Sequence, residues 1–260
     1  MNTRTKRLLW IGGGALGAIV IAGFALWFFV LRSDAPDPVS IDDAVAAVTS
    51  TTAASTTTAA EDETTTTTAA PSTTTTTAAP TPAGIEGNWA VVDGNGSFAG
   101  YRVEEELASI GFTTAAGRTP DVEATLVIDG TTVTEAAVEI DTTTLQSDSS
   151  RRDGAIRSQA LETDLFPTAG FVLAEPIELP AEADSGNTFN VDAVGDLTLH
   201  GVTNRVTIPL AAAFVDDTVV VVGSLLILFE DYDIEQPRAG VVLSVEDNGI
   251  MEFQLFFERA

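Results

Sequence analysis

Apolar and polar side chains alternate in short stretches from residue 85 to the C-terminus. The clearest pair is residues 196–200 and 206–210, which alternate on either side of Gly201. A period of two places one face of a β-strand in a core and the other in water. Similar segments recur at residues 101–107, 122–128, 136–140, 171–173, 189–193 and 251–257. The pattern predicts an all-β domain of about eight antiparallel strands, which close into a barrel wide enough either for its own side chains or for one small apolar ligand.

Three segments depart from this alternation. Residues 219–229 are apolar on both faces, and a strand buried on both sides needs a cover on its outer face, most simply a helix. Residues 150–164 form the one convincing helix of the barrel domain, because a serine can cap its start, apolar residues follow at helical spacing and Pro167 ends it. A brief helix also fits residues 41–48, with no function attached to it.

The N-terminal part differs in character from the barrel segment. Residues 1–7 hold three basic side chains, and residues 8–31 then run for about 24 positions without a charge, against the ~20 needed to span a bilayer. A cleaved secretory signal has a shorter apolar run followed by small residues. This run ends instead in large side chains at residues 27–31, which favours an uncleaved signal anchor. The basic residues before the anchor place the N-terminus in the cytoplasm and everything after Arg32 outside.

Residues 32–84 are rich in Thr, Ala and Pro. Such a tract cannot bury enough surface to offset its chain entropy, which predicts a disordered linker, either an O-glycosylated stalk or an undecorated spacer. The predicted organisation is therefore a cytoplasmic N-terminus at residues 1–7, a transmembrane signal anchor at 8–31, the linker at 32–84 and the barrel at 85–260. The protein is expected in the cell membrane as a single-pass chain with its barrel outside.

The amino-acid composition excludes several kinds of chemical site and binding partner. The chain has no cysteine, which excludes disulfides, thiolate metal sites and cysteine nucleophiles. Its net charge of −26 repels phosphate backbones and anionic membrane surfaces, so nucleic acid is not an expected partner, and the simplest reading of the charge is solubility. No metal and no cofactor are expected, and a homodimer is left open.

The single histidine, His200, is the first residue to consider for catalysis. A histidine base needs a nucleophile and an orienting acid, and a zinc site needs further ligands, but the sequence identifies neither set. Sequence motifs of hydrolases, phosphate-binding loops and zinc proteases are absent. A hydrogen bond that stabilises the turn is the default role of His200, and the chain is not expected to be an enzyme.

The densest positive charge in the barrel domain is Arg151-Arg152-Asp153, with Arg157 one helical turn later. One interpretation is a clamp for an anion or lipid headgroup at the barrel mouth. The simpler one is a helix N-terminus in which Asp153 favours the helix dipole while the arginines face water.

Inward positions carry large and small apolar residues, which can interdigitate into a solid core or line a pocket. Sequence alone leaves both outcomes open. Arg152 and His200 are the candidates for contacts at the mouth. The residues expected to line the lumen and contact a ligand are Phe112, Ala124, Leu126, Val138, Phe166, Phe171, Leu197, Leu199 and Phe253.

Several motifs resemble the YceI-like family in the same order along the chain. They are Gly-Tyr-Arg at 100–102 with Gly-Arg-Thr-Pro at 117–120, Leu-Gln-Ser-Asp at 145–148 followed by Arg-Asp at 152–153, Phe-Pro-Thr-Ala-Gly-Phe at 166–171, and Gly-Asp-Leu-Thr-Leu-His-Gly-Val-Thr at 195–203. The first motif has the form seen in membrane-anchored actinobacterial members. The resemblance covers about residues 86–259. It implies a lipocalin-like antiparallel barrel that holds a polyisoprenoid chain, with no established catalysis.

The first strand departs from the family pattern. Many members carry a histidine there, whereas residues 96–103 read Gly-Ser-Phe-Ala-Gly-Tyr-Arg-Val, so no headgroup contact of that histidine is carried over. The expected function is non-enzymatic binding of a polyisoprenoid or similar apolar lipid at the outer face of the cytoplasmic membrane. A structural or adhesive ectodomain with a solid core is the alternative, and an enzyme acting on an isoprenoid is a third.

Overall fold

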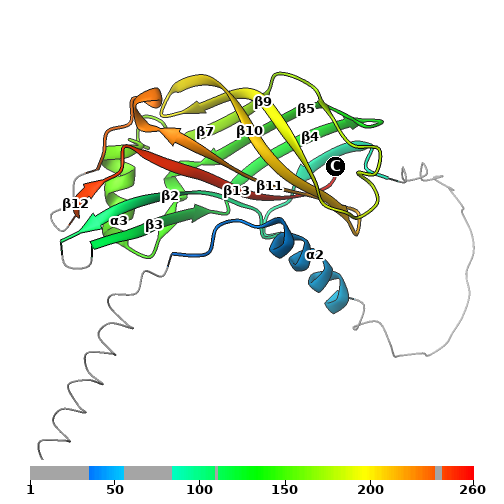
Figure 1. Ribbon diagram of the computed structural model, residues 1–260, viewed down its shortest axis with the longest axis horizontal. Coiled ribbons are helices and arrows are strands. Elements are labelled where there is room, and N and C mark those ends of the chain that lie inside the picture. Colours follow the sequence, from blue (N-terminus) through cyan, green and yellow to red (C-terminus); the bar gives the residue numbers. More distant parts are fainter. Residues whose placement is uncertain (1–34, 56–83, 109–110, 238–241) are drawn as a thin grey trace, which may run out of the picture.

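Eight strands close into a barrel because the first of them, β1 (Gly87–Val91), is paired along both edges. One edge pairs with β4 (Val122–Asp129) and the other with the end of β13 (Asn248–Arg259), both antiparallel. The computed structural model in Figure 1 describes residues 35–55, 84–108, 111–237 and 242–260. The ring runs β1-β4-β5-β7-β9-β10-β11-β13, where the further members are β5 (Thr132–Asp141), β7 (Thr168–Leu173), β9 (Phe189–Leu199), β10 (Val202–Val215) and β11 (Thr218–Leu228). The predicted all-β, eight-stranded barrel is confirmed.

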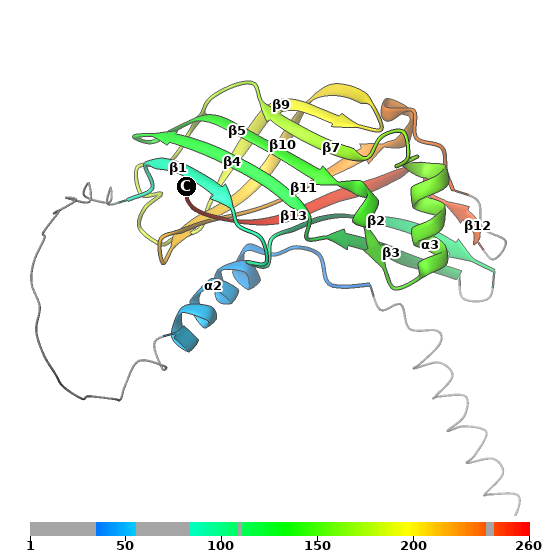
Figure 2. The same ribbon diagram turned by 180° about the vertical axis from the view of Figure 1, so that it is seen from behind.

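A hairpin of β2 (Phe98–Leu107) and β3 (Gly111–Thr119) extends the wall beyond the ring, because β2 pairs with the first half of β13. Helix α3 (Ser150–Ala155) lies at the same end as the tips of this hairpin, as Figure 2 shows. We call this the α3 end of the barrel. The remaining short elements are β6 (Gln146–Ser147), β8 (Ile177–Glu178), β12 (Val242–Val245) and three turns of other helix types, η1 (Thr142–Thr144), η2 (Ile156–Ala160) and η3 (Phe229–Tyr232).

The helix predicted at residues 150–164 is shorter than expected. Ser149 caps it as predicted, with its hydroxyl accepting from the Arg152 N–H. After Ala155 the chain changes to the wider π-helical turn η2, which is closed by a hydrogen bond from the Leu161 N–H to the Ile156 carbonyl at 2.8 Å. A backbone φ of 44° at Glu162 then turns the chain away from the helix, which is why it cannot continue to residue 164.

The cover expected over the outer face of β11 is a helix, α2 (Ile41–Ser55). It packs on β10 and β11 (Figure 1). Ala44 is fully buried against Val220 and Val222. Ile41, Ala44 and Val48 follow helical spacing, so they form one apolar face. The prediction that a helix covers this strand is confirmed, and the helix at residues 41–48 extends to Ser55.

Residues 35–40, which we call the strap, continue from α2 along the outside of the barrel beneath β2 and β3 (Figure 2). Arg102 on β2 donates to the Pro36 carbonyl, and Arg118 on β3 donates to the Asp37 carbonyl at 2.7 Å. Both guanidinium groups also bind Glu252, whose side chain is 1% exposed. The Arg102–Glu252 distance is 2.7 Å and the Arg118–Glu252 distance is 2.8 Å.

The part of the predicted linker within residues 35–55 is therefore strap and helix rather than an extended tract. Its apolar residues find a partner that their own sequence does not reveal, the apolar outer face of β11. Residues 56–83 and the anchor predicted at residues 8–31 lie outside the described residues. Within the described residues, the structure has no helix with the length and apolarity needed to span a membrane.

Replacing the buried carboxylate, Glu252→Gln, is expected to lower the free energy of unfolding by about 3 kcal/mol, because two guanidinium groups lose the anion that they share in a buried site. Urea denaturation followed by circular dichroism measures this. The matched control is Asp196→Asn, which breaks the exposed pair with Arg205 and should cost less than about 1 kcal/mol. Equal effects of the two substitutions would contradict the prediction.

Candidate functional site

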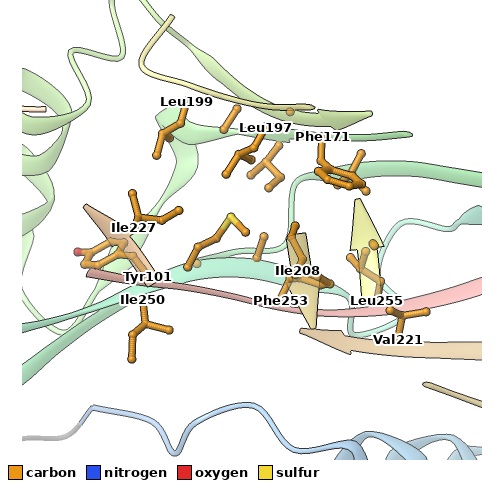
Figure 3. Close-up of a pocket in the computed structure, with 18 of the residues that line it drawn as sticks. Tyr101, Phe171, Leu197, Leu199, Ile208, Val221, Ile227, Ile250, Phe253 and Leu255 are labelled. Carbon is orange, nitrogen blue, oxygen red and sulfur yellow. The ribbon is translucent and has the colours of Figure 1, made fainter. Parts of the chain in front are cut away.

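A cavity of about 260 Å³ lies inside the barrel. Side chains from every ring strand except β1, together with β2 and β3, line it. Figure 3 shows Phe171, Leu197 and Leu199 on one wall, facing Ile227 and Phe253 across the interior. Almost all of the lining is apolar, so the cavity suits a hydrocarbon group.

The interior stays open because aromatic rings lie over glycines of neighbouring strands. A Cβ atom at Gly223 would lie 2.5 Å from Cζ of Phe253, its cross-strand partner on β13. A Cβ at Gly195 on β9 would overlap the ring of Phe171 on β7. These glycines let the rings lie against the wall instead of crossing the lumen. The sequence left a solid core and a pocket open as alternatives, and the structure shows a pocket.

Most residues predicted to line the lumen lie where the alternation placed them. Ala124 faces the interior and is buried in the hydrophobic core of the barrel, although it does not border the cavity. The predicted residues that line the cavity are Leu126, Val138, Phe171, Leu197, Leu199 and Phe253, joined by Arg152.

The prediction is wrong for Phe112, whose side chain is 73% exposed. Phe112 pairs with Glu106 in the part of the β2–β3 hairpin that extends beyond the ring. Both residues lie on the outer face of the hairpin, because the residues that line the cavity are the alternate ones, Tyr101 and Glu105 on β2 and Ala115 on β3. Phe166 also lies outside the cavity lining, where its ring covers Gly201 and packs edge-on against His200 with the ring centres 4.6 Å apart.

His200 holds three loops together and does not line the cavity. It forms the two-residue turn between β9 and β10 with Gly201, and both residues have positive φ. Its Nδ1 donates to the Tyr232 carbonyl oxygen at 3.0 Å, and its Nε2 lies 3.1 Å from Oε2 of Glu162. The role expected by default, a hydrogen bond that stabilises the turn, is what this geometry shows.

The α3 end of the cavity carries a polar cluster formed by Tyr101, Glu105 and Arg152. The side chain of Arg152 is 19% exposed, so it does not lie on a solvated helix face. Its Nη2 donates to Oε1 of Glu105 at 2.7 Å, and its Nη1 donates to Asp148. Arg152 therefore lies at the cavity, as the first interpretation of the arginine cluster expected, whereas Arg151 is exposed to solvent, as the second expected.

Ionisation in this cluster follows from burial and charge. Burial lowers the pKa of Arg152, but the hydrogen bond and charge of Glu105, helped by Asp148, outweigh burial and raise that pKa overall. Burial raises the pKa of the Tyr101 phenol to about 12, although the charge of Arg152 opposes this. At neutral pH the phenol is therefore uncharged and can donate a hydrogen bond.

Sequence reasoning did not single out Tyr101 or Glu105. One signal was available, because Glu105 occupies the same alternation series as Tyr101 and Val103, which places a carboxylate at an inward position of β2. A carboxylate is rarely buried without a partner, so an inward glutamate indicates a cation nearby. Which cation it meets depends on how α3 folds back over β2, which the local pattern does not determine.

Comparisons with known proteins agree with this architecture. Residues 90–257 match the profile of the YceI-like domain. A UPF0312 protein from Vibrio parahaemolyticus is 30% identical over 133 residues, which cover 50% of this chain and 66% of that relative, just under two thirds of its length.

Two solved structures are similar in shape at low sequence identity. A polyisoprenoid-binding domain from Saccharophagus degradans, implicated in plant cell wall breakdown, is 20% identical with a TM-score of 0.52, covering 68% of this chain and 100% of that domain. BcnA from Burkholderia cenocepacia is 19% identical with a TM-score of 0.47, covering 61% of this chain and 95% of that protein. The first of these shows a shared fold.

Substitution of His200 tests its role in the turn. His200→Ala is expected to lower the free energy of unfolding by about 2 kcal/mol, because it removes the donor to the buried Tyr232 carbonyl and places alanine at a φ of 51°. His200→Asn should cost about half as much, since asparagine tolerates that backbone region better. Urea denaturation measures both. An unchanged His200→Ala protein would show that these contacts carry no stability.

Proposed function

The chain belongs to the family of YceI-like domains, and we propose that its barrel binds a polyisoprenoid or similar apolar lipid without catalysing a reaction on it. The observation that carries the proposal is the apolar cavity of about 260 Å³ inside the barrel. Each CH₂ group that leaves water for such a site contributes about 0.8 kcal/mol. A partly enclosed isoprenoid chain can therefore bind well with few polar contacts. The similar domain from Saccharophagus degradans, described as polyisoprenoid-binding, supports this choice of ligand class.

The alternatives are less well supported. A structural or adhesive ectodomain was expected to have a solid core, whereas this barrel contains a cavity. An enzyme acting on an isoprenoid would need a reactive group at the lumen. His200, the candidate base, has both ring nitrogens engaged and lies outside the lining.

We also propose the location expected from the sequence, with an anchor at residues 8–31 and the barrel at the outer face of the cytoplasmic membrane, as in the anchored form of the family. The strap determines how far the barrel would lie from such an anchor. Residues 32–35 alone separate the proposed anchor from Pro36, which Arg102 binds, and four residues reach at most ~14 Å. While the strap stays bound to Arg102 and Arg118, it would hold the barrel close to the membrane surface. If the strap and α2 detached, the linker that continues to residue 84 would allow a longer distance.

The direct test is to purify the full chain from a native-like host and analyse a chloroform extract by mass spectrometry. The expected result is a polyprenyl species at about one molecule per chain. Recovery of a phospholipid at the same ratio would redirect the ligand class. A clean extract together with no uptake of added polyprenyl lipid would refute the proposal.

Filling the cavity provides a second test. Ala136→Trp places a large ring at a lumen-lining position of β5 and should reduce uptake of a polyprenyl lipid at least tenfold. The same change should lower the free energy of unfolding by less than about 1 kcal/mol, because the ring enters empty space. Ala137→Trp on the same strand is the matched control, since residue 137 is exposed and should leave uptake unchanged. Destabilisation of Ala136→Trp by more than about 3 kcal/mol would indicate a solid core instead.

A further inference from the structure

The polar cluster at the α3 end constrains the chemistry of the ligand's head. Among the described residues that line the cavity, four have polar side chains, Tyr101, Glu105, Thr142 and Arg152. Thr142 is already used, because its hydroxyl lies within hydrogen-bonding distance of the Phe166 and Pro167 carbonyl oxygens. The other three lie together, so a lipid whose chain fills the apolar lumen would have its head at this place.

The guanidinium group of Arg152 has one N–H donor from which no group of the described residues accepts a hydrogen bond. Its two terminal nitrogens bind Glu105 and Asp148, whereas its Nε is buried and has no hydrogen-bond partner. A buried donor without a partner destabilises the folded protein, because it has lost its hydrogen bond to water. Arg152 borders the cavity, so a small shift of its side chain on ligand binding would bring this donor to an oxygen atom of the bound molecule and remove the penalty.

The charge around Arg152 determines which oxygen is acceptable. Glu105 and Asp148 both contact the guanidinium, and the buried carboxylate of Asp153 accepts from the backbone N–H and the hydroxyl of Ser147 at 2.8 and 2.7 Å. One cation therefore stands among three carboxylates. The neighbouring cation, Arg151, is exposed. A phosphate, with about −1.5 to −2 charges, would meet a net negative cluster in a site of low dielectric constant.

We infer that the cavity selects isoprenoids whose head is a neutral oxygen acceptor, a hydroxyl or a carbonyl, and rejects those whose head is a phosphate. The inference rests on the proposed function, since it concerns the same cavity. Arg152 supplies the hydrogen bond to the neutral head, and Glu105 is the residue that excludes the anion. The anion clamp that the arginine cluster suggested is therefore reversed by the acidic residues packed around it.

Three molecules with the same C20 tail test this. The full chain in detergent micelles is titrated with geranylgeraniol, geranylgeranyl phosphate and the corresponding hydrocarbon without oxygen, each displacing a fluorescent polyprenyl probe. Geranylgeraniol should bind at least about tenfold more tightly than the phosphate and several-fold more tightly than the hydrocarbon.

The variant Glu105→Gln removes one charge and keeps an acceptor for Arg152. It should raise the affinity for geranylgeranyl phosphate about tenfold and change that for geranylgeraniol less than twofold. Where Glu105→Gln fails to fold, Asp148→Asn removes a charge from the same cluster at a more exposed position. Asp196→Asn is the matched control, because it removes one charge from an exposed pair on the outer wall and should leave the preference unchanged.

The outcomes separate the two claims. If the phosphate binds as tightly as the alcohol, or if Glu105→Gln and Asp196→Asn have equal effects, the head selectivity is overturned while the lipid-binding function stands. If none of the three molecules binds, the proposed function fails and the selectivity fails with it.

Discussion

The hollow interior depends on a steric relation between aromatic rings and glycines on neighbouring strands. Eight strands form a barrel that its own side chains can fill, so closure alone does not create a cavity. Phe253 and Phe171 would fill much of the lumen if their rings crossed it. Gly223 and Gly195 provide the space that lets those rings lie against the wall. The absence of a side chain at these two positions thus helps to keep the lumen open as an apolar pocket.

The outside of the same wall explains why a segment remote in sequence packs on it. β11 is apolar on both faces, and its outer residues Val220 and Val222 would be exposed without α2. The strap adds polar contacts to this apolar burial, because Arg102 and Arg118 each bind both Glu252 and a strap carbonyl. Glu252 can be buried because two guanidinium groups share it. Docking of the segment and burial of the carboxylate therefore depend on the same two arginines.

The strands could be predicted from sequence because alternation is a local property, as residues 122–128 and 196–210 show. The need for a cover on the outer face of β11 could also be predicted, since a strand that is apolar on both faces is not stable with one face in water. The sequence did not predict which segment supplies that cover, because α2 and β11 are more than 160 residues apart and come together only in the folded protein. The prediction that Phe112 lines the lumen was wrong for a related reason. The sequence of one strand does not show which of its two faces turns toward the lumen, and the pairing of Phe112 with Glu106 places it on the face opposite Glu105 and Ala115, which line the cavity.

Arg152 shows why a site residue can be found from sequence while its role cannot. A cluster of arginines at a helix N-terminus indicates anion binding or a solvated surface, and both readings treat the charge of the side chain as available. In the fold that charge is already matched by Glu105 and Asp148, with Asp153 close by. What remains available is a hydrogen-bond donor at Nε, which has direction but adds no net attraction for an anion in this setting. The chemistry of the site is therefore determined by the carboxylates around the arginine, and one of these, Glu105, lies on β2, which is remote from α3 in the sequence.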